Sequence, residues 1–354
     1  MLDELRKRID KIDDKVLKLL EERISIALEI GKIKKEEKLS LLHTDREKGV
    51  LERLIKNRKL LPKEAISAIY REIFSVSLKL QGEPVIAYLG PSGTFTHQAA
   101  EQRFGASNKY IAFNEICDVF MEVVKKRADY GVVPIENSTE GIVSNTLDMF
   151  IDTDVVICDE IYLKISHCLL SREDDISKIK RVYSHPSVFA QCRKFLSENM
   201  PGVELIDMPS TAAAAKRVVD EACSAAIGNK WAGEIYSLNI LKRQVEDFVS
   251  NTTRFVVIGR EYGNATGCDK TSILFSVKDR PGALHDMLMP FAEQGINLTK
   301  IESRPSKIRA WEYMFFIDFE GHIQDEKVKM AISKLNKLCN YLKILGSYPK
   351  GEMV

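Results

Sequence analysis

The chain has 354 residues, more than one hydrophobic core usually organises, so two or three domains are expected. Its 52 basic and 51 acidic side chains leave a net charge of +1, which disfavours nucleic acid and anionic membranes as partners. The charged N-terminus and the lack of a run of about 18 apolar residues predict a protein that is neither exported nor membrane-spanning. Seven scattered cysteines, never spaced C-x-x-C, predict a reducing cytoplasm with no disulfide framework and no metal site.

Residues 3–38 contain no proline and one glycine, and their apolar residues recur at intervals of four and three. This spacing predicts one long helix with an apolar stripe. Such a helix measures about 50 Å, longer than a domain of about 80 residues is wide, so we expect a second chain to cover the stripe in a homodimer or higher homo-oligomer. The apolar positions are Leu5, Ile9, Ile12, Val16, Leu19, Ile26, Ile30 and Ile33.

The rest of the chain divides into three patterns. Two shorter helices are expected first, and Gly-Glu-Pro then ends the helical region at residue 84. Over residues 84–260, short apolar runs alternate with helix-like stretches, which is typical of parallel βα units. After a linker, residues 270–350 are expected to fold as strand, helix, strand, strand, helix, strand, a ferredoxin-like order. The expected helices are 44–57, 62–81, 281–294 and 325–338, and the strands are 85–89, 130–135, 225–228, 272–277, 297–302, 311–319 and 342–347.

Arg23 occupies a position in the apolar stripe where an aliphatic side chain would pack better. A buried arginine needs an anionic partner. Lys34 lies three turns further along the same face, about 16 Å away, which leaves room for a small dianion between the two cations. Arg6 lies about 25 Å from Arg23 along the helix, so it can reach the same ligand only from another subunit.

Two further helices add polar side chains to this picture. Ser77 and Gln81 are four residues apart on one helix face, and Arg46 and Glu47 begin the preceding helix. With the segments LRKRID, EER, GKIK, DRE and SLKLQ, residues 1–82 resemble the all-helical chorismate mutase family, whose dimers are intertwined. The other interpretation is a solvated, charged helix face.

The resemblance implies that chorismate binds here and rearranges to prephenate. A pericyclic reaction needs clamped carboxylates and a stabilised ether oxygen rather than a base or a nucleophile. Where the family usually carries an aspartate near the substrate hydroxyl, this chain has His43, which is expected to contact substrate. An inactive mutase domain joined to a regulated dehydratase of prephenate or arogenate remains the alternative. The catalytic residues implied are Arg6 from the other subunit, Arg23, Lys34, Arg46, Glu47, Ser77 and Gln81.

Five polar clusters lie at expected strand or helix ends within residues 84–260, where open α/β sheets bind ligands. A helix start favours an anion such as a carboxylate, and neither nucleotide-binding glycine motif is present. Taken singly, each cluster is more often a helix cap than a catalytic group. The clusters are GPSGTFTHQAA from residue 90, PIENSTEG from 134, SHPSVFAQC from 184, STAAAA from 210 and TTRF from 252.

In this order the clusters resemble the prephenate dehydratase family over residues 84–260. The resemblance implies two α/β lobes with prephenate in the cleft, which loses water and carbon dioxide to give phenylpyruvate without a cofactor. It ties Thr253 most closely to catalysis, supported by Asn137 and Gln191, with Arg254 and Phe255 in the same motif. Because a hydroxyl is a weak acid, Glu136 is a second candidate for the proton donor. The residues expected to bind substrate are Ser92, Thr94, Ser138, Ser184, His185, Ser210 and Thr211.

Two motifs in residues 270–350 form a pair, a glycine turn before a helix and the segment that ends the next strand. Singly they would be a turn glycine and a solvated edge. Together they resemble the G-A-L and E-S-R-P motifs of the amino-acid-sensing ACT domain of prephenate dehydratases. The resemblance implies feedback inhibition by phenylalanine bound between subunits, whereas a non-catalytic amino-acid sensor is the rival hypothesis. The implied effector residues are Gly282, Ala283, Leu284, His285, Glu302, Ser303, Arg304 and Pro305.

Overall fold

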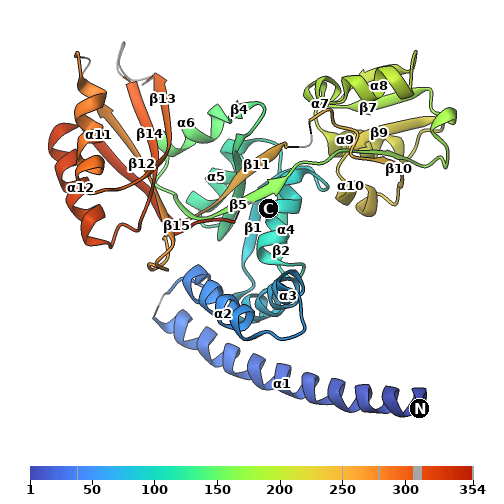
Figure 1. Cartoon of the computed structure of the whole chain (residues 1–354), viewed down its shortest axis with the longest axis horizontal. Coiled ribbons are helices and arrows are strands. Elements are labelled where there is room, and N and C mark those ends of the chain that lie inside the picture. The colour runs from blue at the N-terminus through green and yellow to red at the C-terminus, as the bar shows by residue number, and fades with distance from the viewer. Residues whose placement is uncertain (38, 249, 278–279, 306–312, 353–354) are drawn as a thin grey trace. The chain divides into compact units, whose positions relative to one another are not determined.

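A computed structural model describes residues 1–37, 39–248, 250–277, 280–305 and 313–352. The chain separates into two compact units, the first made of Met1–Val85 with Phe104–Lys109 and the second of Ile86–Arg103 with Tyr110–Val354. Among the described residues, no helix combines the length and the hydrophobicity that spanning a membrane would require. The order of the elements can be followed in Figure 1.

The first unit contains the three expected helices, α1 (Leu2–Glu36), α2 (Thr44–Asn57) and α3 (Lys63–Gly82). The last residue of the first predicted helix, 38, lies outside the described residues. Asp3 and Glu4 in the first turn of α1 and two lysines in its last turn complement the helix dipole. The small core includes Ala27, Val50, Ile66 and Leu78.

The apolar stripe of α1 stays exposed in the single chain. Its side chains up to Leu19 are about half or more exposed, from 47% at Leu5 to 64% at Leu19. Exposed apolar patches of this kind mark interaction surfaces, because isolated soluble proteins rarely leave a contiguous one uncovered. The stripe is therefore available to another surface.

The second unit begins with a lobe built on a mixed sheet of order β2-β1-β3-β11-β5, with β4 paired to β3. Strand β11 runs antiparallel to both β3 and β5, because the chain returns through it after completing a second lobe. The expectation of purely parallel units is wrong at this strand. The elements are β1 (Val85–Leu89), α4 (Phe95–Phe104), β2 (Lys109–Phe113), α5 (Ile116–Val124), β3 (Tyr130–Asn137), β4 (Gly141–Ile142), α6 (Ser144–Asp152), β5 (Val156–Lys164) and β11 (Thr252–Gly259).

The second lobe has its own sheet of order β10-β6-β9-β7-β8. Helices cover it through two apolar clusters, one around Val182 and Ile227 and the other around Ala214 and Ala226. The two-lobed α/β arrangement is thus as predicted. The elements are β6 (Cys168–Ser171), η1 (Ile176–Lys178), β7 (Arg181–Ser184), α7 (Pro186–Gln191), α8 (Arg193–Asn199), β8 (Glu204–Asp207), α9 (Thr211–Val218), β9 (Ser224–Gly228), α10 (Lys230–Ile235) and β10 (Asn239–Arg243).

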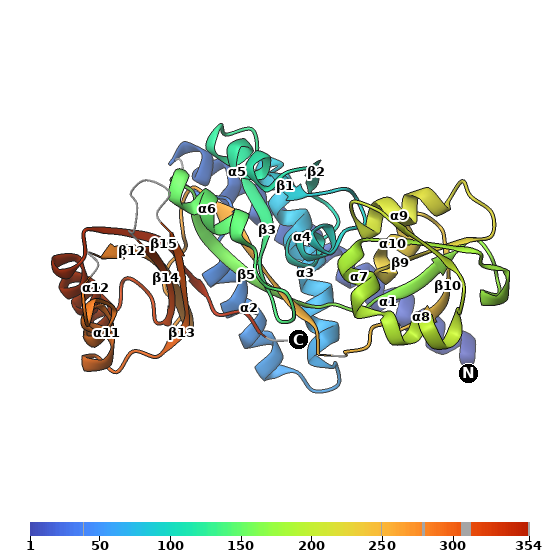
Figure 2. The ribbon, with the colours of Figure 1, turned by 90° about the horizontal axis from the view of Figure 1, so that it is seen from above.

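The C-terminal part has the predicted βαββαβ order on an antiparallel sheet, β13-β14-β12-β15. Both helices lie on one face of this sheet, as Figures 1 and 2 show, over a core that contains Phe275, Phe291 and Phe319. The start of the strand predicted at 311–319 lies outside the described residues. The elements are β12 (Asp269–Val277), α11 (Ala283–Glu293), β13 (Leu298–Pro305), β14 (Tyr313–Glu320), α12 (Glu326–Leu338) and β15 (Tyr341–Pro349).

The other face of this C-terminal sheet packs against the first lobe. Gly346 on β15 lies so close to Ile157 on β5 that a Cβ atom there would collide with the Ile157 backbone. Glycine is needed because only a residue without Cβ lets the two backbones approach in this way. The first lobe and the C-terminal sheet are therefore in direct contact.

Candidate functional site

A pocket of about 600 Å³ lies in the first unit, between the C-terminal half of α1 and helices α2 and α3. Arginine and lysine side chains from α1 and α2 line it, and α3 contributes hydroxyl and amide groups. The sequence-predicted residues that the structure brings together there are Arg23, Lys34, His43, Arg46, Glu47, Ser77 and Gln81.

Arg23 is fixed at one side of this pocket. Its Nη1 donates to Ser77 Oγ at 2.6 Å, and that hydroxyl donates to the Ile73 carbonyl at 2.7 Å. The guanidinium lies 5.6 Å from the centroid of the Phe74 ring, a cation–π contact. Burial lowers the pKa of Arg23, but a guanidinium with an ordinary pKa above about 12 stays charged. The pocket therefore holds an oriented, permanent cation.

Lys34 provides a second fixed cation. Its Nζ donates to the Leu41 carbonyl at 2.7 Å and to Gln81 Oε1 at 3.2 Å. Burial lowers the pKa of Lys34, and the carboxylates of Glu47 and Asp45 oppose that shift. Lys34 and Gln81 thus present an ammonium and an amide to the same part of the pocket.

His43 precedes α2 and lines the pocket as expected. Burial and the nearby Lys34 cation lower the pKa of its imidazole, so the ring is neutral at pH 7. A neutral imidazole has one nitrogen that can accept a hydrogen bond from a hydroxyl. His43 can therefore take over the hydrogen-bonding role of an aspartate without its charge.

Arg6 lies outside this pocket. Its side chain is 67% exposed, and Nη1 is 3.5 Å from Asp3 Oδ1 one turn away. This position agrees with the expectation that Arg6 does not reach the ligand bound by its own chain.

In the second unit, Asn137 and Thr253 face each other across β3 and β11. Asn137 Nδ2 donates to Thr253 Oγ1 at 2.8 Å and to Asn251 Oδ1 at 2.8 Å. Asn137 Oδ1 accepts from the Thr139 and Glu140 amides at 2.9 and 3.0 Å. With its amide oriented from both ends, Asn137 holds the Thr253 hydroxyl in one place.

Gln191 at the end of α7 connects this pair to the second lobe. Its Oε1 accepts from Asn251 Nδ2 at 3.1 Å and lies 3.2 Å from His167 Nε2. Its Nε2 donates to Glu140 Oε1 at 2.9 Å. The polar network of the dehydratase motifs is therefore shared by both lobes.

His167 lies at the crossing between the lobes and is only 2% exposed. Burial lowers the pKa of its imidazole, so the ring is neutral at pH 7. It meets the Phe95 ring edge to face at 5.5 Å, and its Nδ1 has no hydrogen-bond partner among the described residues. His167 thus links Gln191 to the first residues of α4.

Glu136 and Arg254 do not lie with Asn137 and Thr253, although they are adjacent in sequence. Glu136 belongs to β3 and Arg254 to β11. Successive residues of a strand point to opposite faces of the sheet, so these two side chains point away from Asn137 and Thr253. Glu136 Oε2 accepts from Lys300 Nζ at 2.9 Å, and Arg254 donates to Asp318 at 2.5 Å. Both therefore face the C-terminal domain, whereas from the sequence they were expected beside Asn137 and Thr253. Phe255 is buried in the core, 1% exposed.

Several predicted substrate-binding residues act as helix caps or packing groups. Thr94 Oγ1 accepts from the His97 amide at 3.2 Å, His185 Nδ1 from Ser187 N at 3.3 Å, and Ser210 Oγ from Ala213 N at 3.1 Å. The remaining contacts are Ser92 Oγ with Tyr88 OH at 3.0 Å, Ser138 Oγ with Thr252 N at 2.9 Å, and Ser184 Oγ with the Ile227 carbonyl at 2.8 Å, whereas Thr211 is buried at the start of α9.

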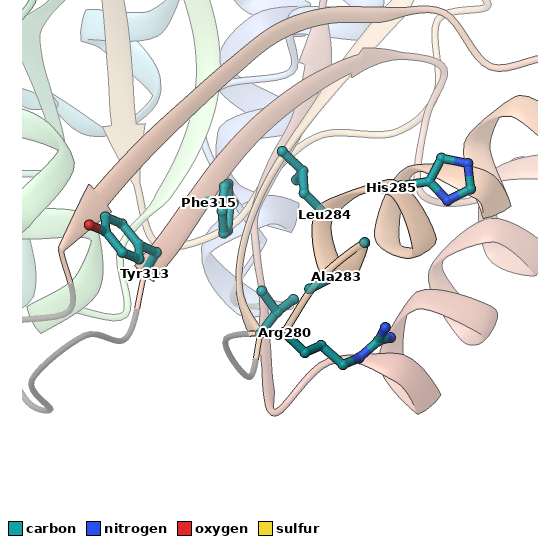
Figure 3. Close-up of a pocket in the computed structure, with 8 residues that line it drawn as sticks. Arg280, Ala283, Leu284, His285, Tyr313 and Phe315 are labelled. Atoms are coloured by element: carbon teal, nitrogen blue, oxygen red, sulfur yellow. The ribbon is translucent and has the colours of Figure 1, made fainter.

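A second pocket, of about 260 Å³, lies at the start of α11. Gly282 stands at the N-cap with φ +78°, a left-handed conformation that favours glycine. Figure 3 shows Leu284 beside Phe315, whereas His285 and Arg280 point away from them. The predicted Gly282, Ala283, Leu284 and His285 all line this pocket, together with Val277, Arg280, Tyr313 and Phe315.

The E-S-R-P strand β13 divides between two faces. Ser303 pairs with Phe315 and Pro305 with Tyr313, so these two residues share the sheet face of the pocket. Arg304 points to the other face and donates to Ser144 Oγ at 2.8 Å. Glu302 has the same orientation as Arg304, so half of the predicted effector motif faces the catalytic lobe.

Three family models match the chain: chorismate mutase type II over residues 5–82, prephenate dehydratase over 86–262 and the ACT domain over 271–337. A bifunctional chorismate mutase/prephenate dehydratase of Aquifex aeolicus is 48% identical, with 99% of this chain and 98% of that protein covered. The chain belongs to the family of bifunctional chorismate mutase/prephenate dehydratases. The Stutzerimonas stutzeri member is 44% identical over the same shares of both chains. The crystal structure of prephenate dehydratase from Arthrobacter aurescens with L-Phe matches with a TM-score of 0.70 and 35% identity, covering 75% of this chain and 90% of that one.

Sequence reasoning assigned no role to four polar residues that the structure places in the two candidate sites. Arg53 lines the mutase pocket seven residues after Arg46, and this two-turn spacing was a usable signal. His167, Asn251 and Glu140 join the dehydratase network from lobe crossings and a turn. Glu140 belongs to the PIENSTEG cluster and Asn251 directly precedes TTRF, so both lie beside recognisable motifs, whereas no local pattern marks His167.

Proposed function

We propose that the cationic pocket of the first unit converts chorismate to prephenate, and that the Asn137–Thr253 network converts prephenate to phenylpyruvate, with phenylalanine as feedback inhibitor. The observation that carries the proposal is that a cationic pocket and the Asn137–Thr253 network occupy separate parts of a member of the bifunctional family. The mutase and dehydratase activities are those of the family. The assignment of residues, domain limits of 1–82, 84–260 and 270–350, and a cytoplasmic location are our proposals.

In the mutase pocket, the chain supplies charge at fixed positions. Arg23 is held by Ser77 and binds one substrate carboxylate, while Arg46 and Arg53 of α2 extend the positive lining. Lys34 and Gln81 face the ether oxygen, whose negative charge grows as the carbon–oxygen bond breaks. Donors that are already in place stabilise this charge without reorganisation. No side chain needs to transfer a proton.

In the dehydratase site, the departing ring hydroxyl must receive a proton as the carboxylate leaves as carbon dioxide and its electrons complete the aromatic ring. Asn137 Nδ2 already donates to Thr253 Oγ1, so the Thr253 proton points elsewhere and can pass to the leaving hydroxyl, which departs as water, while a proton from solvent restores the Thr253 hydroxyl. The same amide stabilises the partial negative charge that develops on Oγ1. This supports Thr253 over Glu136, whose carboxylate faces Lys300.

In the C-terminal pocket, Val277, Leu284, Tyr313 and Phe315 offer apolar walls to an aromatic ring. Helix α11 begins at this pocket without a side-chain cap, and backbone N–H groups in the first turn of a helix can donate to a carboxylate. Ser303 and Pro305 lie on the same sheet face at the edge strand. These features support phenylalanine as the ligand, and the exposed edge suits the expectation that a second subunit completes the site.

The exposed α1 stripe supports a homodimer or a higher homo-oligomer. Ile9, Ile12 and Val16 are each about half exposed, and covering them would remove a large apolar surface from water. Arg6 lies on the same uncovered part of α1, so an antiparallel partner helix would bring its guanidinium to a pocket that its own chain cannot reach.

One experiment tests the whole proposal. Purified full-length protein is given chorismate, prephenate or arogenate, and the products are followed with and without phenylalanine. We expect chorismate to give prephenate and then phenylpyruvate, with the second step slowed by phenylalanine. Turnover of prephenate but not chorismate would leave an inactive mutase domain. Phenylalanine binding without any turnover would instead identify a sensor and overturn the proposal.

A further inference from the structure

Strands β3 and β11 carry two neighbouring cross-strand pairs that face opposite ways. Thr253 lies opposite Asn137, and Arg254 lies opposite Glu136. The first pair belongs to the dehydratase network, and the second faces the ACT domain. Because neighbouring residues share one backbone, a displacement of one pair also displaces the other.

Arg254 is held at the surface of the ACT sheet. The side chain is 4% exposed, and Nη1 donates to Asp318 Oδ2 at 2.5 Å while Nη2 donates to Tyr348 OH at 2.9 Å. Its Nε donates to Glu160 Oε2 at 2.8 Å within the catalytic lobe. All three sides of the planar guanidinium are therefore bonded, which fixes the side chain in position and orientation.

Glu136 is held by the strand that carries the E-S-R-P motif. Lys300 on β13 donates to its Oε2 at 2.9 Å, and the lysine side chain is only 12% exposed. Three residues further along the same strand, Ser303 lies on the face of the effector pocket. A shift of β13 would therefore act on the effector pocket and on Glu136 together.

The chemistry of these contacts is better suited to transmitting a displacement from one sheet to the other than to stabilising the interface. Glu136, Glu160 and Asp318 are matched by Arg254, Lys270 and Lys300 in one ionic cluster. Apolar residues would often stabilise such an interface equally well, because burying charges costs solvation energy. Ionic hydrogen bonds, in contrast, are directional and tie particular atoms of one sheet to particular atoms of the other.

We propose that Lys300 and Asp318 are positioning residues for the dehydratase reaction, which act through Glu136 and Arg254 on Asn137 and Thr253. Phenylalanine would inhibit by shifting β13 and thereby disturbing this alignment. The inference rests on the proposed function, since it assumes dehydration at Thr253 and an effector pocket at α11. The role of the ionic cluster would be to couple the effector pocket to the dehydratase network.

The test compares two lysines of the same interface. Lys300→Met removes the contact to Glu136. Lys343→Met is the matched control, because Lys343 is 16% exposed and bonds the Phe150 and Thr153 carbonyls at the end of α6 rather than a side chain of β3 or β11. Without phenylalanine, we expect Lys300→Met to lower the dehydratase kcat about fivefold with little change in KM, whereas the control retains it. Lys300→Arg should restore most of the loss.

The second readout is the dehydratase rate with saturating phenylalanine divided by the rate without it, with phenylalanine binding measured by calorimetry. We expect this ratio to rise about fivefold in Lys300→Met while phenylalanine still binds, and to stay unchanged in Lys343→Met. Equal effects of the two variants, or no effect of Lys300→Met, would overturn the inference. A wild-type enzyme without dehydratase turnover or without phenylalanine inhibition would instead refute the proposed function, and the inference with it.

Discussion

The two catalytic sites are built from different kinds of interaction. The mutase pocket presents cations held by neutral partners. Arg23 donates to Ser77 and contacts the Phe74 ring, and Lys34 donates to Gln81 and to the Leu41 carbonyl. The dehydratase network consists of amides, a hydroxyl and an imidazole, which bond one another from Thr253 through Asn137 and Asn251 to Gln191, and of one carboxylate, Glu140, at its end. A substrate anion would complete the interactions of the mutase pocket, whereas most polar groups of the dehydratase network already have hydrogen-bond partners before substrate binds.

This difference follows from the reactions. A rearrangement of a dianion gains from strong fixed charges, since binding the carboxylates also supplies the orientation. A dehydration driven by aromatisation gains from one correctly aimed hydroxyl, and neutral hydrogen bonds provide direction without charge. We therefore expect truncation of a cation in the mutase pocket to cost more than any single change in the dehydratase network.

Arg23→Met gives the largest effect that we predict. It keeps the apolar stem but removes the charge, so a substrate carboxylate would lie unpaired in the pocket, at a cost of about 2–5 kcal/mol. The mutase kcat/KM should fall about 30- to 5,000-fold, since each 1.36 kcal/mol is tenfold in rate. Lys56→Met, an exposed lysine in the last turn of α2, is the control. Dehydratase activity measured with prephenate should not change, and a mutase loss below about tenfold would contradict the role of Arg23.

Thr253→Val and Glu136→Gln give the next largest effects and compare the two faces of the β3–β11 pair. Valine keeps the shape of threonine but lacks the hydroxyl, so kcat for prephenate should fall about 10²-fold, as when a fixed donor is removed from other active sites. Glu136→Gln keeps a hydrogen-bond acceptor for Lys300, and we expect less than about tenfold loss. Stopped assays of phenylpyruvate formation measure both. The opposite ranking would restore Glu136 as the proton donor.

How far the sequence predicts each site depends on the element that carries it. In α1, a cation that interrupts a four-three apolar pattern is visible within one helix, so Arg23 and Lys34 were found from the pattern itself. The homodimer expectation came from the same stripe and stays a prediction. In helices, residues near in sequence and correct in phase share a face, and the inference needs no other part of the fold.

In the strands, reasoning from the local sequence pattern was wrong about where two strands end or begin. The strand predicted at 130–135 extends to Asn137, and the motif that was expected to precede a strand at Thr253 is part of β11. Glu136 and Arg254 therefore alternate away from the site instead of joining a polar loop. His167 was not predicted for another reason. Its hydrogen-bond partner Gln191 comes from a different lobe, and no local sequence pattern connects the two residues.

Gly31→Ala gives the smallest effect and tests how closely the mutase pocket is fitted. Gly31 on α1 packs against α3, and an added Cβ would lie 3.0 Å from both Cα and Cγ of Gln81. The contact is tight enough to displace Gln81 and lengthen its hydrogen bond to Lys34, now 3.2 Å. We expect the mutase kcat to fall about three- to tenfold, because weakening a hydrogen bond from an ammonium costs roughly 1 kcal/mol.

Gly49→Ala is the matched control for Gly31→Ala. It is the same substitution inside a helix of the same unit, and nothing lies within 4 Å of the added Cβ. Alanine at this position should raise stability by about 0.5–1 kcal/mol through helix propensity and leave mutase turnover unchanged. If both variants gained stability and kept full mutase activity, Gln81 would tolerate displacement, and the ether oxygen would depend on Lys34 alone. If only Gly31→Ala lost activity while both remained folded, the close α1–α3 contact would be what aligns the amide with the ammonium.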